Sequence, residues 1–129
     1  MATSAGTGWK TASVHEIPPV KPDWPATWKS IRHHCGITAF GINGVTKDAG
    51  NVLTPEHDET ASGQQEVFFV HEGEVLATLD GEEVRVPAGS IIFCEPGTKR
   101  KIEATASPTT MLIIGAPVGR AYEIGPWEQ

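Results

Sequence analysis

Side chains able to do chemistry gather in two places along this sequence of 129 residues. The first is the polar stretch 47–65, which carries His57 and Glu59 and is suited to acid–base chemistry. A long irregular segment inside a compact domain is often functional, although a run such as Glu-His-Asp-Glu-Thr is more usually loop surface. The second is the basic run Lys99–Lys101, which is either a solvated strand or turn or part of a site.

The two cysteines, Cys35 and Cys94, are 59 positions apart and form no Cys-x-x-Cys motif, which excludes a zinc knuckle. In a reducing compartment we expect two buried thiols, with a single disulfide as the alternative. A nucleophilic cysteine needs a lowered pKa, and nothing near Cys94 in the sequence clearly supplies one. We therefore expect Cys94 to be a small core residue.

Further candidate residues lie in apolar surroundings. Glu66 opens an apolar strand, where a carboxylate lies either at the solvent edge or buried with a partner. Strand alternation places His71 on the opposite face from Glu66, so a structural role is expected for His71. On a strand His33 and His34 would face opposite ways, and at most one of them could reach a cavity.

The elements that position these residues are predicted to be strands. Short apolar segments recur every 8–12 residues between Gly- and Pro-containing turns, among them the Asp80-Gly81 hairpin signal, and no helical pattern stands out. This arrangement predicts an all-β sandwich or barrel. The strands are expected at 31–45 (one long or two short), near 52–53, and at 66–72, 74–80, 84–86, 90–94, 100–105 and 110–116.

The N-terminal segment has a different composition. Four prolines fall between Trp9 and Trp28, so this segment is predicted to be an extended arm whose tryptophans pack onto the body. Trp127 suggests that the other end is pinned in the same way. The domain prediction is an arm over residues 1–30 and a barrel over residues 31–129, within a single domain.

Charge and hydropathy exclude several partners. The net charge of −6 disfavours nucleic acid and anionic membranes, because both require a basic surface. No apolar stretch approaches the roughly 18 residues of a membrane span, and the first ten residues lack the apolar core of a signal peptide. A cytoplasmic location is expected.

Two motifs in the centre of the sequence resemble those of the cupin family of small jelly-roll barrels. Gly50 is followed after six residues by His57-Asp58-Glu59, after six more by Glu66 and after six more by Gly73. The second motif runs from Gly89 through Pro96-Gly97 to Arg100. The resemblance covers about residues 35–116 and implies a cupin-type jelly-roll barrel that is commonly a homodimer.

The departures from the family pattern bear on function. The resemblance implies a metal site made of two His and a Glu from the first motif and a His from the second. His57 and Glu66 match in type, whereas Glu59 stands where the second His belongs and Arg100 replaces the His of the second motif. Counted back from Glu66 without an insertion, Thr60 and Ser62 would occupy the ligand positions instead.

Arg100 favours a metal-free pocket, because a guanidinium has no lone pair to donate and repels a nearby cation. It could pair with Glu66, or it could bind a ligand carboxylate or phosphate. The alternative is a site of His57, Glu59 and Glu66 holding Fe, Mn or Zn, which accept one-His, two-carboxylate sets.

The preferred hypothesis is therefore a binding protein for a small, anionic and partly apolar molecule held by Arg100, without a cofactor. Its site would also include His57, Glu59 and Glu66, with Phe40, Phe68 and Met111 as apolar lining, each of which could equally be core. The alternative is an enzyme. It would be either a metal-dependent oxygenase, isomerase or lyase, or a metal-free enzyme with Glu66 or His57 as general base.

Overall fold

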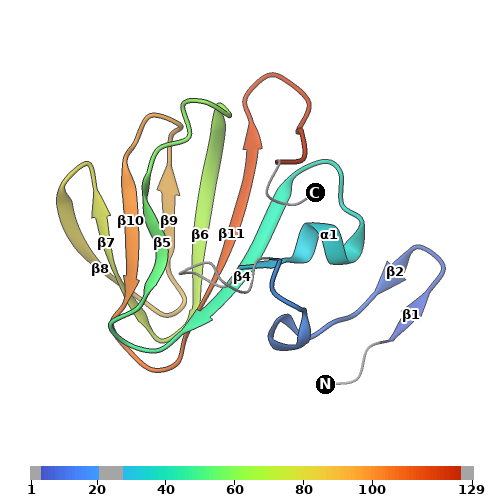
Figure 1. Cartoon of the computed structure of the whole chain (residues 1–129), viewed down its shortest axis with the longest axis horizontal. Coiled ribbons are helices and arrows are strands. Elements are labelled where there is room, and N and C mark those ends of the chain that lie inside the picture. Colours follow the sequence, from blue (N-terminus) through green and yellow to red (C-terminus); the bar gives the residue numbers. More distant parts are fainter. Residues whose placement is uncertain (1–3, 21–27, 126–129) are drawn as a thin grey trace.

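Two antiparallel sheets face each other and form a jelly-roll β-barrel in the computed structural model, which describes residues 4–20 and 28–125 (Figure 1). The five-stranded sheet has the order β3 (Lys29–Ser30), β4 (Gly41–Lys47), β11 (Thr109–Pro117), β6 (Gln64–Glu72), β9 (Ile91–Cys94). The four-stranded sheet has the order β5 (Val52–His57), β10 (Arg100–Ala104), β7 (Glu74–Leu79), β8 (Glu82–Pro87). The all-β prediction is confirmed.

Period-two alternation along the strands builds the core between the two sheets. On β6, Glu66, Phe68 and Val70 are buried, and the outward-facing His71 is exposed, as expected from alternation. On β9, Ile92 and Cys94 are buried, which agrees with the expectation that Cys94 is a core residue. The remaining core residues are Val45, Leu53, Val75, Ala77, Val86, Ile102, Ala104, Met111 and Ile113.

Two glycine-containing turns fix the β6–β7–β8 meander. Asp80 and Gly81 both have positive φ, 50° and 83°, as a tight two-residue hairpin requires. Gly73 has φ of 81° and also lies close to its neighbours, since a Cβ there would collide with the Thr109 hydroxyl and the Pro108 carbonyl. Each connection therefore needs its glycine, one for conformation alone and the other for conformation and space.

The prediction of strands across 31–45 is wrong in its first third, because Ile31–Cys35 forms the short helix α1. The Ser30 side chain caps this helix by accepting a hydrogen bond from the His33 backbone N–H at 3.1 Å, and Gly36 ends it with φ of 77°. His33 and His34 are consequently on a helix, and the argument from opposite strand faces does not apply to them. None of the described helices is long and apolar enough to span a membrane.

The N-terminal segment follows the prediction only in part. Trp28 packs against the core, and its Nε1 donates to the Leu53 carbonyl at 2.7 Å. Trp9, by contrast, is 58% exposed on a small hairpin of β1 (Ala5–Gly6) and β2 (Trp9–Lys10), so its expected packing onto the body is wrong. Figure 1 shows this hairpin standing off from the barrel, beyond the 3₁₀ turn η1 (Val14–Glu16). Trp24 and Trp127 lie outside the described residues.

Candidate metal and ligand site

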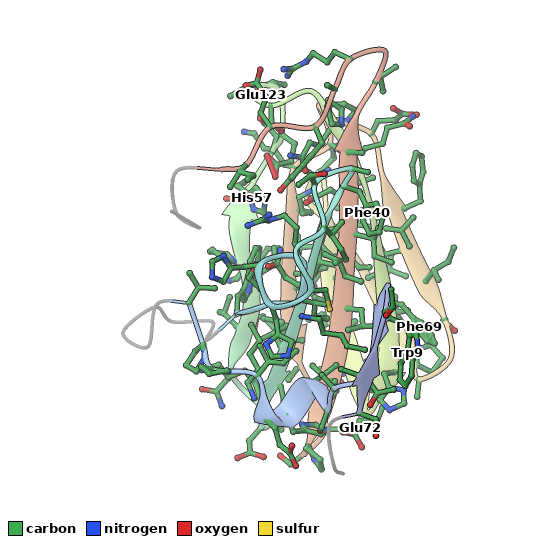
Figure 2. The ribbon with its side chains drawn as sticks, turned by 90° about the vertical axis from the view of Figure 1, so that its right-hand side faces the viewer. Trp9, Phe40, His57, Phe69, Glu72 and Glu123 are labelled. Atoms are coloured by element: carbon green, nitrogen blue, oxygen red, sulfur yellow. The ribbon has the colours of Figure 1, made fainter. Side chains whose placement is uncertain are left out.

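Three side chains from two strands and one loop meet at one end of the barrel. His57 is the last residue of β5, Glu59 follows in the loop, and Glu66 is the third residue of β6. One ligand atom from each lies within 4.8 Å of the others, so the three could hold a metal ion. The segments that follow β5 and β11 lie at this end, and Figure 2 shows His57 toward the end marked by Glu123, away from Glu72.

Hydrogen bonds orient the first two groups. His57 Nδ1 lies 2.8 Å from the Pro55 carbonyl, which can only accept, so Nδ1 is the donor and the neutral ring leaves Nε2 free of its proton. His57 Nε2 lies 3.7 Å from Glu59 Oε1. Ser62 Oγ donates to Glu59 Oε2 at 3.1 Å, whereas the Thr60 hydroxyl donates to Asp58. Ser62 thus supports a member of the cluster, whereas Thr60 is bonded to Asp58 outside it.

Arg100 begins β10 opposite His57 in the β5–β10 ladder and points into the barrel toward Glu66. The guanidinium is fully buried and Glu66 is 7% exposed, yet Nη1 and Oε1 are 4.0 Å apart. Arg100 Nη2 donates to the Glu95 carbonyl at 2.9 Å. Arg100 Nε and Nη1 and Glu66 Oε1 have no hydrogen-bond partner among the described residues. Arg100 therefore retains two donor groups, and Glu66 one acceptor oxygen, that could bind a further group.

The cluster attracts positive charge. Burial raises the pKa of Glu66 to about 7, and the charge of Glu59 adds to this against the opposing effect of Arg100. The neighbouring Glu59 carboxylate raises the pKa of His57. Burial alone would raise the pKa of Glu59, but the interaction with His57 and the hydrogen bond from Ser62 bring it below the usual value. A bound proton or metal ion would be stabilised by the two carboxylates at this place.

A cavity of about 70 Å³ opens beside the carboxylates. This volume suits an ion with water or a molecule of a few atoms, since drug-sized ligands need several hundred Å³. Its described walls carry no Lys or Arg, and neither His57 nor Arg100 belongs to them. The lining residues are Trp28, Gly41, Asn43, Glu59, Gln64, Glu66, Ile113, Gly115, Tyr122 and Gly125.

Sequence reasoning missed three polar members of this wall, Asn43, Gln64 and Tyr122. Asn43 is buried and its Oδ1 has no partner among the described residues. Alternation with the buried Val45 could have marked Asn43 as an inward polar residue. Tyr122 lies in a segment without regular structure, and no sequence pattern announces its approach to Gly41.

The residues predicted as apolar lining lie elsewhere. Phe68 and Met111 are fully buried in the core cluster, and Phe40 is exposed at the surface before β4; none of the three lines the cavity. The cavity is therefore more polar than the sequence suggested.

Both cysteines are free, so the disulfide alternative is excluded. Cys94 is buried as expected, whereas Cys35 is exposed at the end of α1, which corrects the expectation of two buried thiols. Burial raises the pKa of Cys94, against the effect of the neighbouring Arg100. A raised pKa argues against a nucleophilic role for this thiol.

A wider opening of about 340 Å³ adjoins the cavity and shares Glu59, Gln64 and Gly125 with it. Arg120 also lines this opening, and its guanidinium donates to the Ser62 carbonyl. The bond links the segment after β11 to the loop that carries Glu59. The cavity is thus reached through an outer vestibule that contains one cation among its described residues.

The family assignment follows from these features and from a sequence match. The cupin domain model matches residues 49–115, which span more than half of the chain and include His57, Glu59, Glu66 and Arg100. The chain belongs to the cupin family.

Solved structures agree on the fold. A cupin protein from Bacteroides fragilis superposes with a TM-score of 0.65 at 19% identity, covering 84% of this chain and 92% of that one. A protein with a double-stranded β-helix domain from Klebsiella pneumoniae gives 0.67 at 16% identity, covering 88% and 97%. A predicted oxalate decarboxylase from Thermotoga maritima gives 0.66 at 18% identity, covering 84% and 99%. No significant relative was found among curated proteins.

Proposed function

We propose that this cupin binds a divalent transition-metal ion, Fe, Mn or Zn, through His57, Glu59 and Glu66 and carries out metal-dependent chemistry on a small polar molecule. The observation that carries the proposal is the convergence of these three ligand atoms beside a small polar cavity. Oε1 of the buried Glu66 carboxylate has no hydrogen-bond partner among the described residues. A buried carboxylate oxygen without a partner is costly, and a cation would offset that cost.

The donor set fits such an ion. One imidazole and two carboxylates suit Fe, Mn and Zn, and the two negative charges match a divalent cation. His57 already has its proton on Nδ1, which is the tautomer that exposes Nε2 as a ligand atom. A bound ion would act as a Lewis acid that polarises an oxygen of the substrate.

The chain's own residues define what the site accepts. Asn43 and Gln64 present amide groups beside the two carboxylates and can orient a small polar molecule. Arg100 lies outside the cavity wall, which favours a role in holding Glu66 over direct contact with a ligand. At neutral pH the empty site holds a proton on Glu66 part of the time, so metal uptake releases protons.

Titration calorimetry of chelator-treated protein with Mn(II) and Zn(II) tests the proposal. We expect one site per chain, with the affinity lowered more than about 100-fold in Glu66→Gln, because losing a ligand costs more than losing a residue that only orients one. Glu103→Gln is the matched control and keeps the wild-type affinity, since Glu103 pairs with Lys101 outside the site. Wild-type protein that takes up neither metal would refute the metal function.

A second candidate function, binding of a small anion without metal, is supported by the unused donors Nε and Nη1 of the buried Arg100. In this case metal-free protein would bind inorganic phosphate or oxalate, and Arg100→Met would abolish the binding. Equal affinities in the wild type and the variant would exclude Arg100 as the anion-binding group.

A further inference from the structure

Two glycines without side chains form one wall of the cavity beside the metal cluster. Gly41 begins β4 and lies directly opposite Gly115 of β11, which lies in turn opposite Glu66 of β6. In the next row toward the core, Asn43 lies opposite Ile113. All five residues are on the inward face, where larger side chains fill the rest of the barrel. The space over Gly41 and Gly115, here called the glycine floor, is therefore left open.

Both glycines of the floor are needed for space and not for backbone conformation. Neither of them has a positive φ. A Cβ on Gly41 would lie 2.9 Å from the Tyr122 hydroxyl. A Cβ on Gly115 would lie 2.8 Å from Gln64 Oε1 and 3.0 Å from Glu66 Cγ. Contacts this short force the neighbouring group to move, so a methyl group on either glycine would disturb the cavity.

The groups that face this space are hydrogen-bond acceptors. Glu59 and Glu66 contribute their carboxylates, and Gln64 Oε1 lies beside Gly115. The described part of the wall carries no Lys or Arg. A metal ion bound by the two carboxylates would use their charge, and the amide oxygens would remain as acceptors for the rest of a bound molecule.

Asn43 Oδ1 is the acceptor that the barrel itself leaves unsatisfied. Asn43 is 7% exposed, and its Oδ1 has no hydrogen-bond partner among the described residues. The next inward residue of β4, Val45, is part of the apolar core. An amide oxygen buried without a partner is destabilising, and a group that donates to it from the cavity would remove that cost.

We propose that the molecule taken by this site carries a hydroxyl group, which lies over the glycine floor and donates a hydrogen bond to Asn43 Oδ1. This substrate class rests on the proposed metal function, in which the ion attracts another oxygen of the same molecule. The cavity of about 70 Å³ limits the molecule to a few non-hydrogen atoms. A small hydroxy acid meets these conditions, whereas a phosphate or a carboxylate without the ion would need a cationic wall.

Calorimetric titration of the Mn(II)-loaded protein with glycolate and with acetate tests the proposal, because glycolate carries a hydroxyl group that acetate lacks. We expect the wild type to prefer glycolate. Asn43→Leu should weaken glycolate binding about tenfold and leave acetate binding unchanged, because leucine is similar in size to asparagine but has no acceptor. The hydroxyl group can also contact the ion, so the reduced preference in the variant is the result that reports on Asn43.

Gly41→Ala tests the glycine floor. Its methyl group would meet the Tyr122 hydroxyl, so both probes should bind about tenfold more weakly. The Mn(II) affinity should stay at the wild-type value, because Gly41 is not one of the three ligands. Gly97→Ala is the matched control, since a Cβ on Gly97 would meet nothing within 4 Å and its φ is not positive. This control should bind both probes as the wild type does.

The other outcomes overturn the proposal. An equal loss of both probes in Asn43→Leu, or no loss of glycolate, would exclude Asn43 as the hydroxyl acceptor, and wild-type affinities in Gly41→Ala would exclude the floor. A wild type that binds Mn(II) but does not prefer glycolate would refute the substrate class and leave the metal function standing. A wild type that takes up no Mn(II) would refute both. If circular dichroism shows Asn43→Leu unfolded, Asn43→Val replaces it under the same criteria.

Discussion

Glu66 is central to both candidate functions of this site, metal binding and the binding of a small anion. Its carboxylate lies between Arg100, with which it forms a loose ion pair, and the pair formed by Glu59 and His57. The Glu59 carboxylate is a second negative group that the same positive charges would stabilise. Burial raises the pKa of Glu66, and the charge of Glu59 raises it further. Glu59 also raises the pKa of His57, against the opposing effect of burial on that ring. A metal ion or bound protons would each reduce the negative charge at this place.

The first prediction concerns proton binding in the absence of metal. The pKa of Glu66 is about 7 in the folded protein against 4.5 for an ordinary Glu, so folded chains bind more protons between these values. The raised pKa of Glu66 therefore adds up to about 3 kcal/mol to the free energy of unfolding below pH 4.5, and this contribution is lost as the pH rises through 7. Urea unfolding in EDTA should show this loss from pH 5 to pH 8 in the wild type and a smaller one in Glu66→Gln. Parallel pH profiles would contradict it.

How much of the site the sequence could predict depends on the range of the interactions. His57, Glu59 and Glu66 were found because a motif keeps them within ten positions of each other. Asn43 and Tyr122 were missed because they reach the cavity only through the pairing of β4 with β11 and the return of the chain after β11. Spacing along the chain cannot reveal contacts made across seventy residues.

At the scale of elements, alternation and turn residues predicted most strands within one or two residues, including β7, β9 and β11. Helix α1 was missed because its five residues are too few to show helical periodicity, and only the caps Ser30 and Gly36 mark it. The strand β5 was also longer than expected, since it extends to His57 and so brings that residue to the edge of the site.

The second prediction separates two kinds of glycine. Gly73→Ala should destabilise the fold by more than Gly81→Ala, although both residues have φ above 80°. Gly81 has open space around it, so its variant bears only the conformational cost of about 1–2 kcal/mol. Gly73→Ala adds a collision with Thr109 and Pro108, worth about 1–3 kcal/mol more. Denaturant midpoints of the two variants provide the comparison, and equal values would show that the β6–β7 turn relaxes freely.

At the scale of the whole molecule, one barrel carries two separate surfaces. These are a polar cavity at one end and an apolar patch on the outer face of the larger sheet, where Ile91, Phe93 and Ile114 are exposed. The core residues from Val45 to Ile113 lie between the sheets and hold both in place. Substitutions at the patch and at the cavity should consequently act independently, because no residue is shared between them.

The third prediction is that metal stabilises the whole barrel. At a concentration 100 times its dissociation constant, a bound ion adds about 2.7 kcal/mol to the free energy of unfolding. For a domain of this size that corresponds to a rise in Tm of about 5–10 °C. Scanning calorimetry with Mn(II) should show the rise, EDTA should reverse it, and Glu66→Gln should abolish it. A rise of the same size in Glu66→Gln would place the ion elsewhere.

The segment that follows β11 has a practical consequence for anyone preparing this protein. Tyr122 and Gly125 are part of the cavity wall, and only four residues follow Gly125 in the sequence. A histidine tag fused after Gln129 would add imidazoles a few residues from this wall, where they would compete with the proposed metal site for nickel or zinc. A tag fused before Met1 would precede the hairpin that stands away from the barrel, so measurements of metal content are best made with the tag at that end.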